Sequence, residues 1–151
     1  MAIENLARRN KLSMLWIILD LASLSTFLLM VFDPNMLKQI IAGQVAGEQI
    51  TSTFLLVTAG FMLLGPMVMA FASQTLKDSL NRWANMIVGA VYTAWWLLGI
   101  MDVLANPTVY LPIMDAVAIV APALVVWYAY RWPKEVVQPV RAPVQKGEIT
   151  V

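Results

Sequence analysis

The sequence predicts an all-α membrane protein, a four-span antiparallel helical bundle with both termini in the cytoplasm. Three observations predict this fold. First, 60% of the 151 residues are hydrophobic and only 13% are charged, whereas soluble domains average about 45–50% apolar and about 25% charged residues. Second, four segments reach the length of about 20 apolar residues that the hydrocarbon core requires. Third, the basic residues are distributed unevenly among the connecting segments.

Each predicted span is a stretch of predominantly apolar residues bounded by polar ones. The spans cover residues 12–32, 52–73, 83–104 and 110–131. The second span has no charged residue between Phe54 and Ala72. The other three spans contain one aspartate each, namely Asp20, Asp102 and Asp115.

Asp20 does not exclude the first span. An aspartate near the centre of a membrane helix costs roughly 2.5–3.5 kcal/mol, and each Leu, Ile, Phe or Val contributes roughly 0.3–0.6 kcal/mol in favour of insertion. Eleven such residues lie between Ser13 and Phe32, so their sum of about 3–7 kcal/mol offsets the aspartate.

The positive-inside rule orients the bundle. Nine of the ten basic residues belong to segments on one side, and only Lys38 lies on the other. The nine are Arg8, Arg9, Lys11, Lys77, Arg82, Arg131, Lys134, Arg141 and Lys146. Residues 1–11 are therefore predicted to be a cytoplasmic tail, and the proline-containing residues 133–151 a disordered cytoplasmic tail of a plasma-membrane protein.

Two connecting segments and the aromatic residues refine this prediction. Residues 36–41 have helical apolar spacing and form either an interfacial helix or an irregular loop, which the glycine-rich residues 43–47 end. Residues 105–108 indicate a turn that makes the last two spans a hairpin. The expected interfacial aromatic belt comprises Trp16, Trp83, Trp127 and Trp132 at the inner boundary and Tyr110 at the outer one.

Ionisable residues inside spans are functional candidates because they usually face a bundle interior or a water-filled cavity. Asp20 lies about 12 Å from the inner edge by helix rise, deeper than any other charge in the sequence. A stripe along the third span is predicted to pack inward, with its glycines permitting close helix approach. This stripe comprises Arg82, Asn85, Gly89, Tyr92, Trp96 and Gly99.

These features predict two sets of site residues. The candidates for binding a ligand or ion are Asp20, Asn85, Tyr92, Trp96 and Asp115. The candidates for a structural polar network are Arg82, Asn81 and Asp102. The alternative for Asp20 with Asn85 or Arg82 is helix–helix association without a ligand. Gly65-Pro66 and Pro122 predict kinks whose freed carbonyls need other partners.

The sequence Asn81-Arg82-Trp83-Ala84-Asn85 resembles the motif that opens the third span in a family of small bacterial and archaeal membrane proteins of unknown function. The resemblance covers residues 10–132 and implies a four-helix protein with an acidic residue in the first span and often another in the fourth, here Asp20 and Asp115. At the position of Gly65-Pro66 these relatives have an acidic residue followed by proline, so this chain departs from their pattern there. The resemblance implies no activity.

Composition excludes several kinds of chemistry. The chain has no Cys and no His, so disulfides, thiolate or imidazole metal sites and Ser–His or Cys–His catalysis are absent. We expect no cofactor and no metal; the ten methionines form no clustered array that would bind copper. The sequence has no basic block for nucleic acid.

Three functions remain, with the lipid bilayer as the common partner. The first is an oligomeric carrier or channel-like protein for a small cation, a proton or a hydrophobic molecule, with Asp20 as the binding residue. The second is a non-catalytic accessory or scaffold subunit of a larger membrane complex. The third, an intramembrane aspartyl hydrolase, is disfavoured because Asp20 lies roughly 10–15 Å from the depth of Asp102 and Asp115. Asp102 and Asp115 could still pair with each other, but neither belongs to a catalytic motif.

Overall fold

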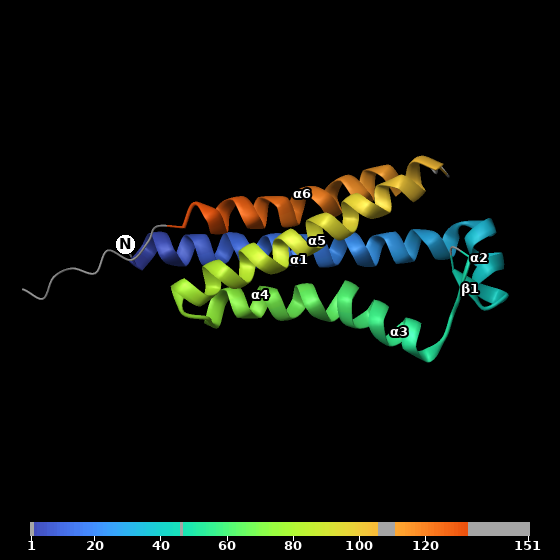
Figure 1. The fold of residues 1–151 in the computed structure, drawn as a ribbon, viewed down its shortest axis with the longest axis horizontal. Helices are drawn as coiled ribbons and strands as arrows, with labels where there is room; N and C mark the ends of the chain where they lie inside the picture. Colours follow the sequence, from blue (N-terminus) through green and yellow to red (C-terminus); the bar gives the residue numbers. More distant parts are fainter. Residues whose placement is uncertain (1, 46, 106–110, 133–151) are drawn as a thin grey trace, which may run out of the picture.

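The computed structural model describes residues 2–45, 47–105 and 111–132, and most of them are helical (Figure 1). The elements are α1 (Ala2–Phe32), α2 (Pro34–Ile41), β1 (Gln44–Val45), β2 (Glu48–Gln49), α3 (Ser52–Ala59), the π-helix η1 (Gly60–Leu64), α4 (Gly65–Thr75), α5 (Asp78–Ala105) and α6 (Leu111–Tyr130). The prediction of an all-α chain is thus confirmed in its helical content, with one two-stranded antiparallel hairpin added.

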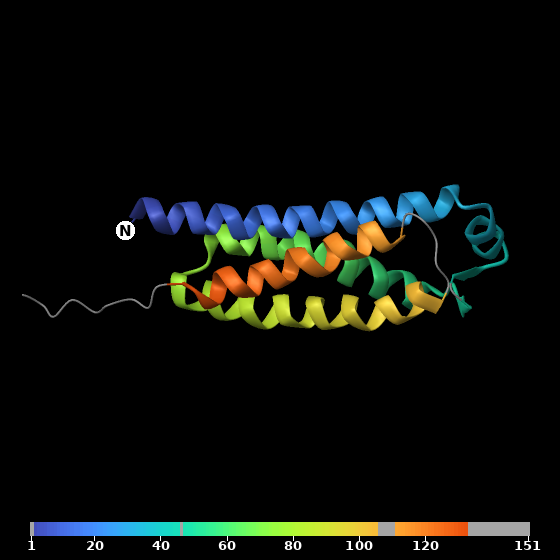
Figure 2. The same cartoon turned by 90° about the horizontal axis from the view of Figure 1, so that it is seen from above.

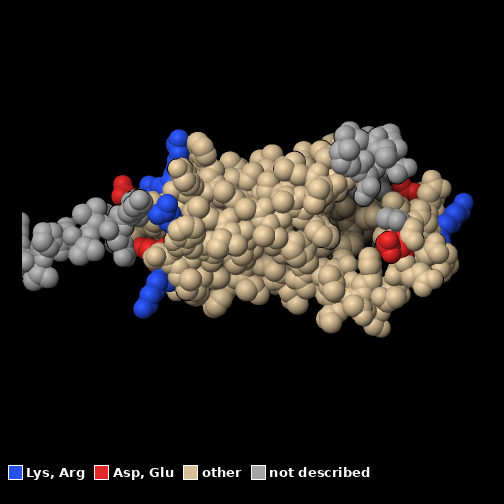
Figure 3. All heavy atoms as spheres, viewed as in Figure 1, with Lys and Arg blue, Asp and Glu red and all other residues tan. Residues whose placement is uncertain are grey.

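Four helical stretches of the described chain are long and apolar enough to cross a membrane. They are Glu4–Phe32, Ser52–Thr75, Asp78–Ile100 and Pro112–Tyr130. In Figure 3 the Lys, Arg, Asp and Glu side chains on the visible face gather at the two ends of the molecule, and a band without them lies between. Such a band is the surface that a bilayer requires.

The first helix begins ten residues earlier than the predicted span. Residues 2–11, expected as a tail, form the first turns of α1. Their polar side chains have partners on other helices: the Arg9 guanidinium forms an ion pair with Asp78 at 2.6 Å, and the Asn5 amide donates to the same carboxylate at 2.9 Å. These partners lie about 70 positions away in the sequence, so the local sequence does not reveal them. The polar residues of this segment alone therefore indicated a tail.

The segment after α1 is helical, which decides between the two expectations for residues 36–41. Asp33 caps α2 by accepting hydrogen bonds from the backbone N–H groups of Asn35 and Met36, and Pro34 at the start of a helix costs no hydrogen bond. Gly43 (φ +77°) then ends the helix in the left-handed region that glycine adopts readily. The expected turn at 105–108 and the expected tail at 133–151 lie largely or wholly outside the described residues.

The long helices lie lengthwise beside one another (Figure 2). Helix α1 packs against both α4 and α6, and α5 packs along α6, whereas α4 and α5 contact each other little. At Gly89 a Cβ atom would lie 2.9 Å from a methyl group of Val126, so this glycine permits the close approach expected of it. Gly99, by contrast, has nothing within 4 Å of a built Cβ in the described chain, so that prediction was wrong there.

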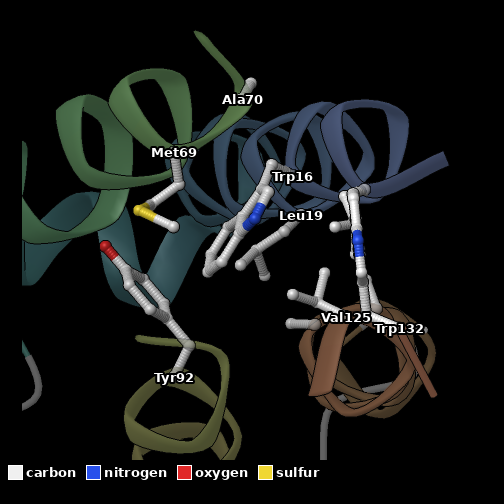
Figure 4. Packing of buried hydrophobic residues seen from close by; sticks show 10 residues of the cluster. Trp16, Leu19, Met69, Ala70, Tyr92, Val125 and Trp132 are labelled. Carbon is white, nitrogen blue, oxygen red and sulfur yellow. The ribbon is translucent and has the colours of Figure 1, made fainter. Parts of the chain in front are cut away.

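The core lies where α1, α4, α5 and α6 meet. Figure 4 shows Trp16 extending from α1 into this core and Tyr92 extending from α5 with its hydroxyl directed toward the η1–α4 helix. Small residues on α6, including Ala118 and Ala121, let α1 approach closely. The buried hydrophobic cluster comprises Leu12, Trp16, Leu19, Met69, Ala70, Tyr92, Ala118, Ala121, Val125 and Trp132.

Candidate functional site

Asp20 lies on α1, one helical turn beyond Trp16. The side chain is partly buried, and its Oδ1 atom is fully buried without a hydrogen-bond partner among the described residues. Trp16, one turn before Asp20, meets the ring of Tyr92 on α5 with the edge of its own ring. A buried carboxylate oxygen that the protein leaves unpaired is costly, which makes Asp20 a candidate for binding a proton or a cation.

Aromatic rings surround the Tyr92 side of this site. The edge of the Trp16 ring meets Tyr92 at a centroid distance of 5.4 Å, and the Phe61 ring stacks on Tyr92 at 4.3 Å. Phe61 also contacts Trp95 at 5.1 Å. Aromatic faces attract cations through their quadrupole, so a carboxylate beside such a cluster is chemically suited to a monovalent cation.

The π-helix η1 fixes Tyr92 in place. In η1 the Gly65 N–H donates to the Gly60 carbonyl rather than to that of Phe61, and the next residue, Pro66, has no N–H to offer. The Phe61 carbonyl is left without a backbone donor and accepts a hydrogen bond from the Tyr92 hydroxyl. The prediction that Gly65-Pro66 frees a carbonyl that needs another partner is therefore confirmed.

A buried amide network joins α1, α4 and α5 beside the Asp20 site. Asn85 Oδ1 accepts from Trp16 Nε1 at 2.6 Å and from Ser73 Oγ at 3.1 Å, and the Ser73 hydroxyl shares its one proton between Asn85 and the Met69 carbonyl at 2.8 Å. Asn85 Nδ2 donates to the backbone oxygen of Asn81 at 2.8 Å and to its Oδ1 at 2.6 Å, while Asn81 Nδ2 donates to the Ser73 carbonyl at 2.8 Å. Two donors and two acceptor lone pairs are all that an asparagine side chain has, so Asn85 uses its full capacity within the protein.

The other candidates lie apart from this network. Arg82 Nε is buried without a hydrogen-bond partner, and no direct hydrogen bond joins Arg82 to Asp20 within the described chain. Trp96 Nε1 is likewise buried and unpartnered there. Asp115 is 5% exposed on α6, and the side chain of Asp102 lies outside the described residues. Among the residues that the structure describes, no group of three or more His, Cys, Asp or Glu side chains could hold a metal.

Trp16, Phe61 and Ser73 were not among the predicted site residues. Trp16 was expected in the interfacial belt, and the structure instead buries its ring completely and pairs its indole N–H with Asn85. Trp83 and Trp127, in contrast, are exposed as a belt requires. The signal for Trp16 was its position four residues before Asp20, which places both residues on one face of the helix.

A comparison with protein families matches residues 3–138 to a family of unknown function, DUF6326. The chain belongs to this family. The match extends beyond residues 10–132, the range expected from the resemblance, at both ends. No curated protein and no solved structure matches the chain. Membership of the DUF6326 family confirms the likeness to proteins of unknown function, so an activity has to be argued from the site.

Proposed function

We propose that this chain crosses the membrane four times as an antiparallel bundle with both termini in the cytoplasm, and that it carries a small monovalent cation or proton. In this proposal Asp20 is the binding residue, and Tyr92 and Trp96 line the site. The observation that carries the proposal is the buried Oδ1 atom of Asp20, which has no partner among the described residues and lies one helical turn beyond Trp16 of the aromatic cluster.

Neutralisation of the Asp20 carboxylate is the physical basis of the proposed binding of a cation or a proton. A carboxylate within a span is costly unless it is paired or hydrated. A proton or an organic cation removes that cost, and either one competes with the other for the same oxygen. The ring of Tyr92 would hold an organic cation by its face, and the indole N–H of Trp96 offers a donor for a polar substituent.

The amide network has a separate role in the proposal. Asn85 holds the Trp16 indole against Tyr92, and all four hydrogen-bonding positions of its side chain have partners within the protein. We therefore assign Asn85 to positioning the aromatic wall rather than to contact with the ligand. Arg82 lies nearer the basic end of the molecule, and Asp115 is a further carboxylate on α6 that the carrier mechanism does not require.

Flux through the purified full chain in proteoliposomes tests the carrier function. With an imposed pH gradient, we expect uptake of the small cation tetramethylammonium, which does not readily cross lipid unaided, by the parent chain and its loss in Asp20→Asn, which is close in shape but carries no charge. The matched control is Asp33→Asn at the cap of α2, because asparagine caps helices as well as aspartate does. Normal flux in Asp20→Asn with normal folding would contradict the proposal.

A second candidate function is supported by the surface of α3. This helix has no buried residue, and in the described chain it packs mainly against the η1 segment that continues it. A helix left so open is what an accessory subunit would present to a larger complex, or one copy to another in a homo-oligomer. Native mass spectrometry of the protein extracted gently from its membrane separates the two functions. Stoichiometric recovery with another protein, together with an absence of flux, would favour the subunit.

A further inference from the structure

A groove of about 320 Å³ runs between α1 and α6. Every side chain that lines it is apolar. The lining residues are Leu15, Ile18, Ala116, Val117, Val120, Ala121 and Leu124. On α6 these positions extend over about 12 Å of helix rise, so the groove is elongated and apolar and follows the seam, the line along which α1 and α6 meet.

The same helix faces end in basic residues. On α1, Ile18 and Leu15 continue at helical spacing to Lys11 and Arg8. Lys11 lies one turn, about 6 Å, from Leu15. The cations of α1 therefore lie at one end of the groove rather than elsewhere on the molecule.

Helix α6 contributes the third cation and two aromatic rings at that end. The face that carries Leu124 continues to Trp127 and Arg131. The Arg131 guanidinium lies over the Trp127 ring at 4.0 Å, and Lys11 Nζ lies 5.7 Å from the centre of the Tyr128 ring. Arg8 bridges the two helices by donating to the Arg131 carbonyl at 3.0 Å. Tryptophan, tyrosine and basic residues together are typical of the headgroup level of a membrane.

The charge at this end is complementary to an anion. Arg8, Lys11 and Arg131 give three positive charges, and the acidic residue on this face of α1 is Glu4, one turn before Arg8. Arg9 is a different case, because its guanidinium is held by Asp78 at 2.6 Å on the α5 side of α1.

We propose that this groove, together with the basic cluster Arg8, Lys11 and Arg131, binds one anionic phospholipid. The phosphate would lie at the three cations, and one acyl chain would lie along the apolar seam. Basic pockets between membrane helices recognise anionic headgroups in this way. The inference rests on the membrane-spanning arrangement proposed above but not on cation carriage. A second copy is disfavoured as the occupant because a two-fold contact through this face would bring the same three cations of each copy together.

Native mass spectrometry of the full chain in detergent tests the site, with phosphatidylglycerol and phosphatidylcholine of identical acyl chains as probes. We expect one phosphatidylglycerol per chain to be retained, with phosphatidylcholine bound at least tenfold more weakly. Removing each cation should weaken phosphatidylglycerol binding about fivefold, so Arg8→Gln with Lys11→Gln loses about 25-fold. Lys77→Gln is the control, because it removes an exposed cation from the α4–α5 connection instead.

A second variant tests the groove itself. Val120 is 54% exposed, so Val120→Trp fills the seam without entering the core, and we expect it to weaken binding of both lipids. Equal retention of the two lipids, or unchanged affinity in the Arg8→Gln, Lys11→Gln variant, would overturn the proposal. A dimer that Val120→Trp dissociates would overturn it as well and would assign the groove to a second copy. None of these outcomes depends on flux, so they are independent of the carrier function.

Discussion

Asn85 and Asp20 are both polar residues within predicted spans, and the structure treats them differently. Asn85 is fully buried, and all four of its hydrogen-bonding positions are used. Asp20 leaves a buried oxygen without a partner in the described chain. A saturated network holds helices together, whereas an unsaturated carboxylate is a feature that stability alone does not explain. The two residues therefore predict opposite outcomes on substitution.

Asn85→Ala is expected to destabilise the folded protein by about 2 kcal/mol. The substitution leaves the Trp16 indole N–H without its acceptor and removes the bonds of Asn85 to Ser73 and Asn81, although the Ser73 hydroxyl keeps the Met69 carbonyl as an acceptor at 2.8 Å. Interhelical hydrogen bonds in membrane proteins contribute about 0.6 kcal/mol each with a maximum near 1.7. Reversible unfolding in detergent measures the change. Asn10→Ala is the control, because this exposed amide accepts from Gln74 at the surface and its loss should stay within about 0.5 kcal/mol. Equal effects of the two substitutions would argue against the network.

At the scale of elements, the second span is one helix made of three segments. The α-helix α3, the π-helix η1 and the α-helix α4 follow one another without a loop. The Gly65-Pro66 sequence predicts a freed carbonyl at this position. It does not predict that the backbone hydrogen bonds shift by one residue to form a π-helix, or which side chain donates to the freed carbonyl. That partner, Tyr92, lies on α5, and its pairing with Phe61 depends on tertiary packing rather than on local sequence.

Gly65→Ala tests this arrangement. A Cβ atom at position 65 would collide with the Tyr92 hydroxyl, so we expect a loss of about 2 kcal/mol in unfolding free energy. In a Tyr92→Phe background the hydroxyl is absent, and the penalty of Gly65→Ala should fall by at least half. Gly99→Ala is the control, because its built Cβ meets nothing within 4 Å among the described residues and alanine favours a helix over glycine. An equal penalty in both backgrounds would show that the hydroxyl does not fill this space.

For the whole molecule, the sequence predicted what depends on composition and missed what depends on contacts between distant residues. The four apolar stretches follow directly from hydropathy and are helices in the structure. Residues 2–11 were expected to be a tail because of their polar and charged residues, and in the structure Arg9 and Asn5 of this helical segment bond to Asp78, which is distant in the sequence. Asp20 was identified from its depth and Trp16 shares its helix face by spacing, whereas the stacking of Phe61 on Tyr92 required the folded chain.

The sides on which the connections lie remain a prediction of the charge distribution, and the absence of native cysteine makes it directly testable. A membrane-impermeant maleimide applied to intact cells should label Lys38→Cys, in the α2 segment, and should label Lys77→Cys, between α4 and α5, only after the membrane is opened. Leu98→Cys is the control for burial in lipid: its side chain is 74% exposed in the protein alone, so it would react in a water-soluble protein and should stay unlabelled in a membrane. Labelling of Lys77→Cys in intact cells would reverse the orientation. Because nine cations would then have to be placed outside against one inside, that result would mean that something other than the positive-inside rule orients the chain.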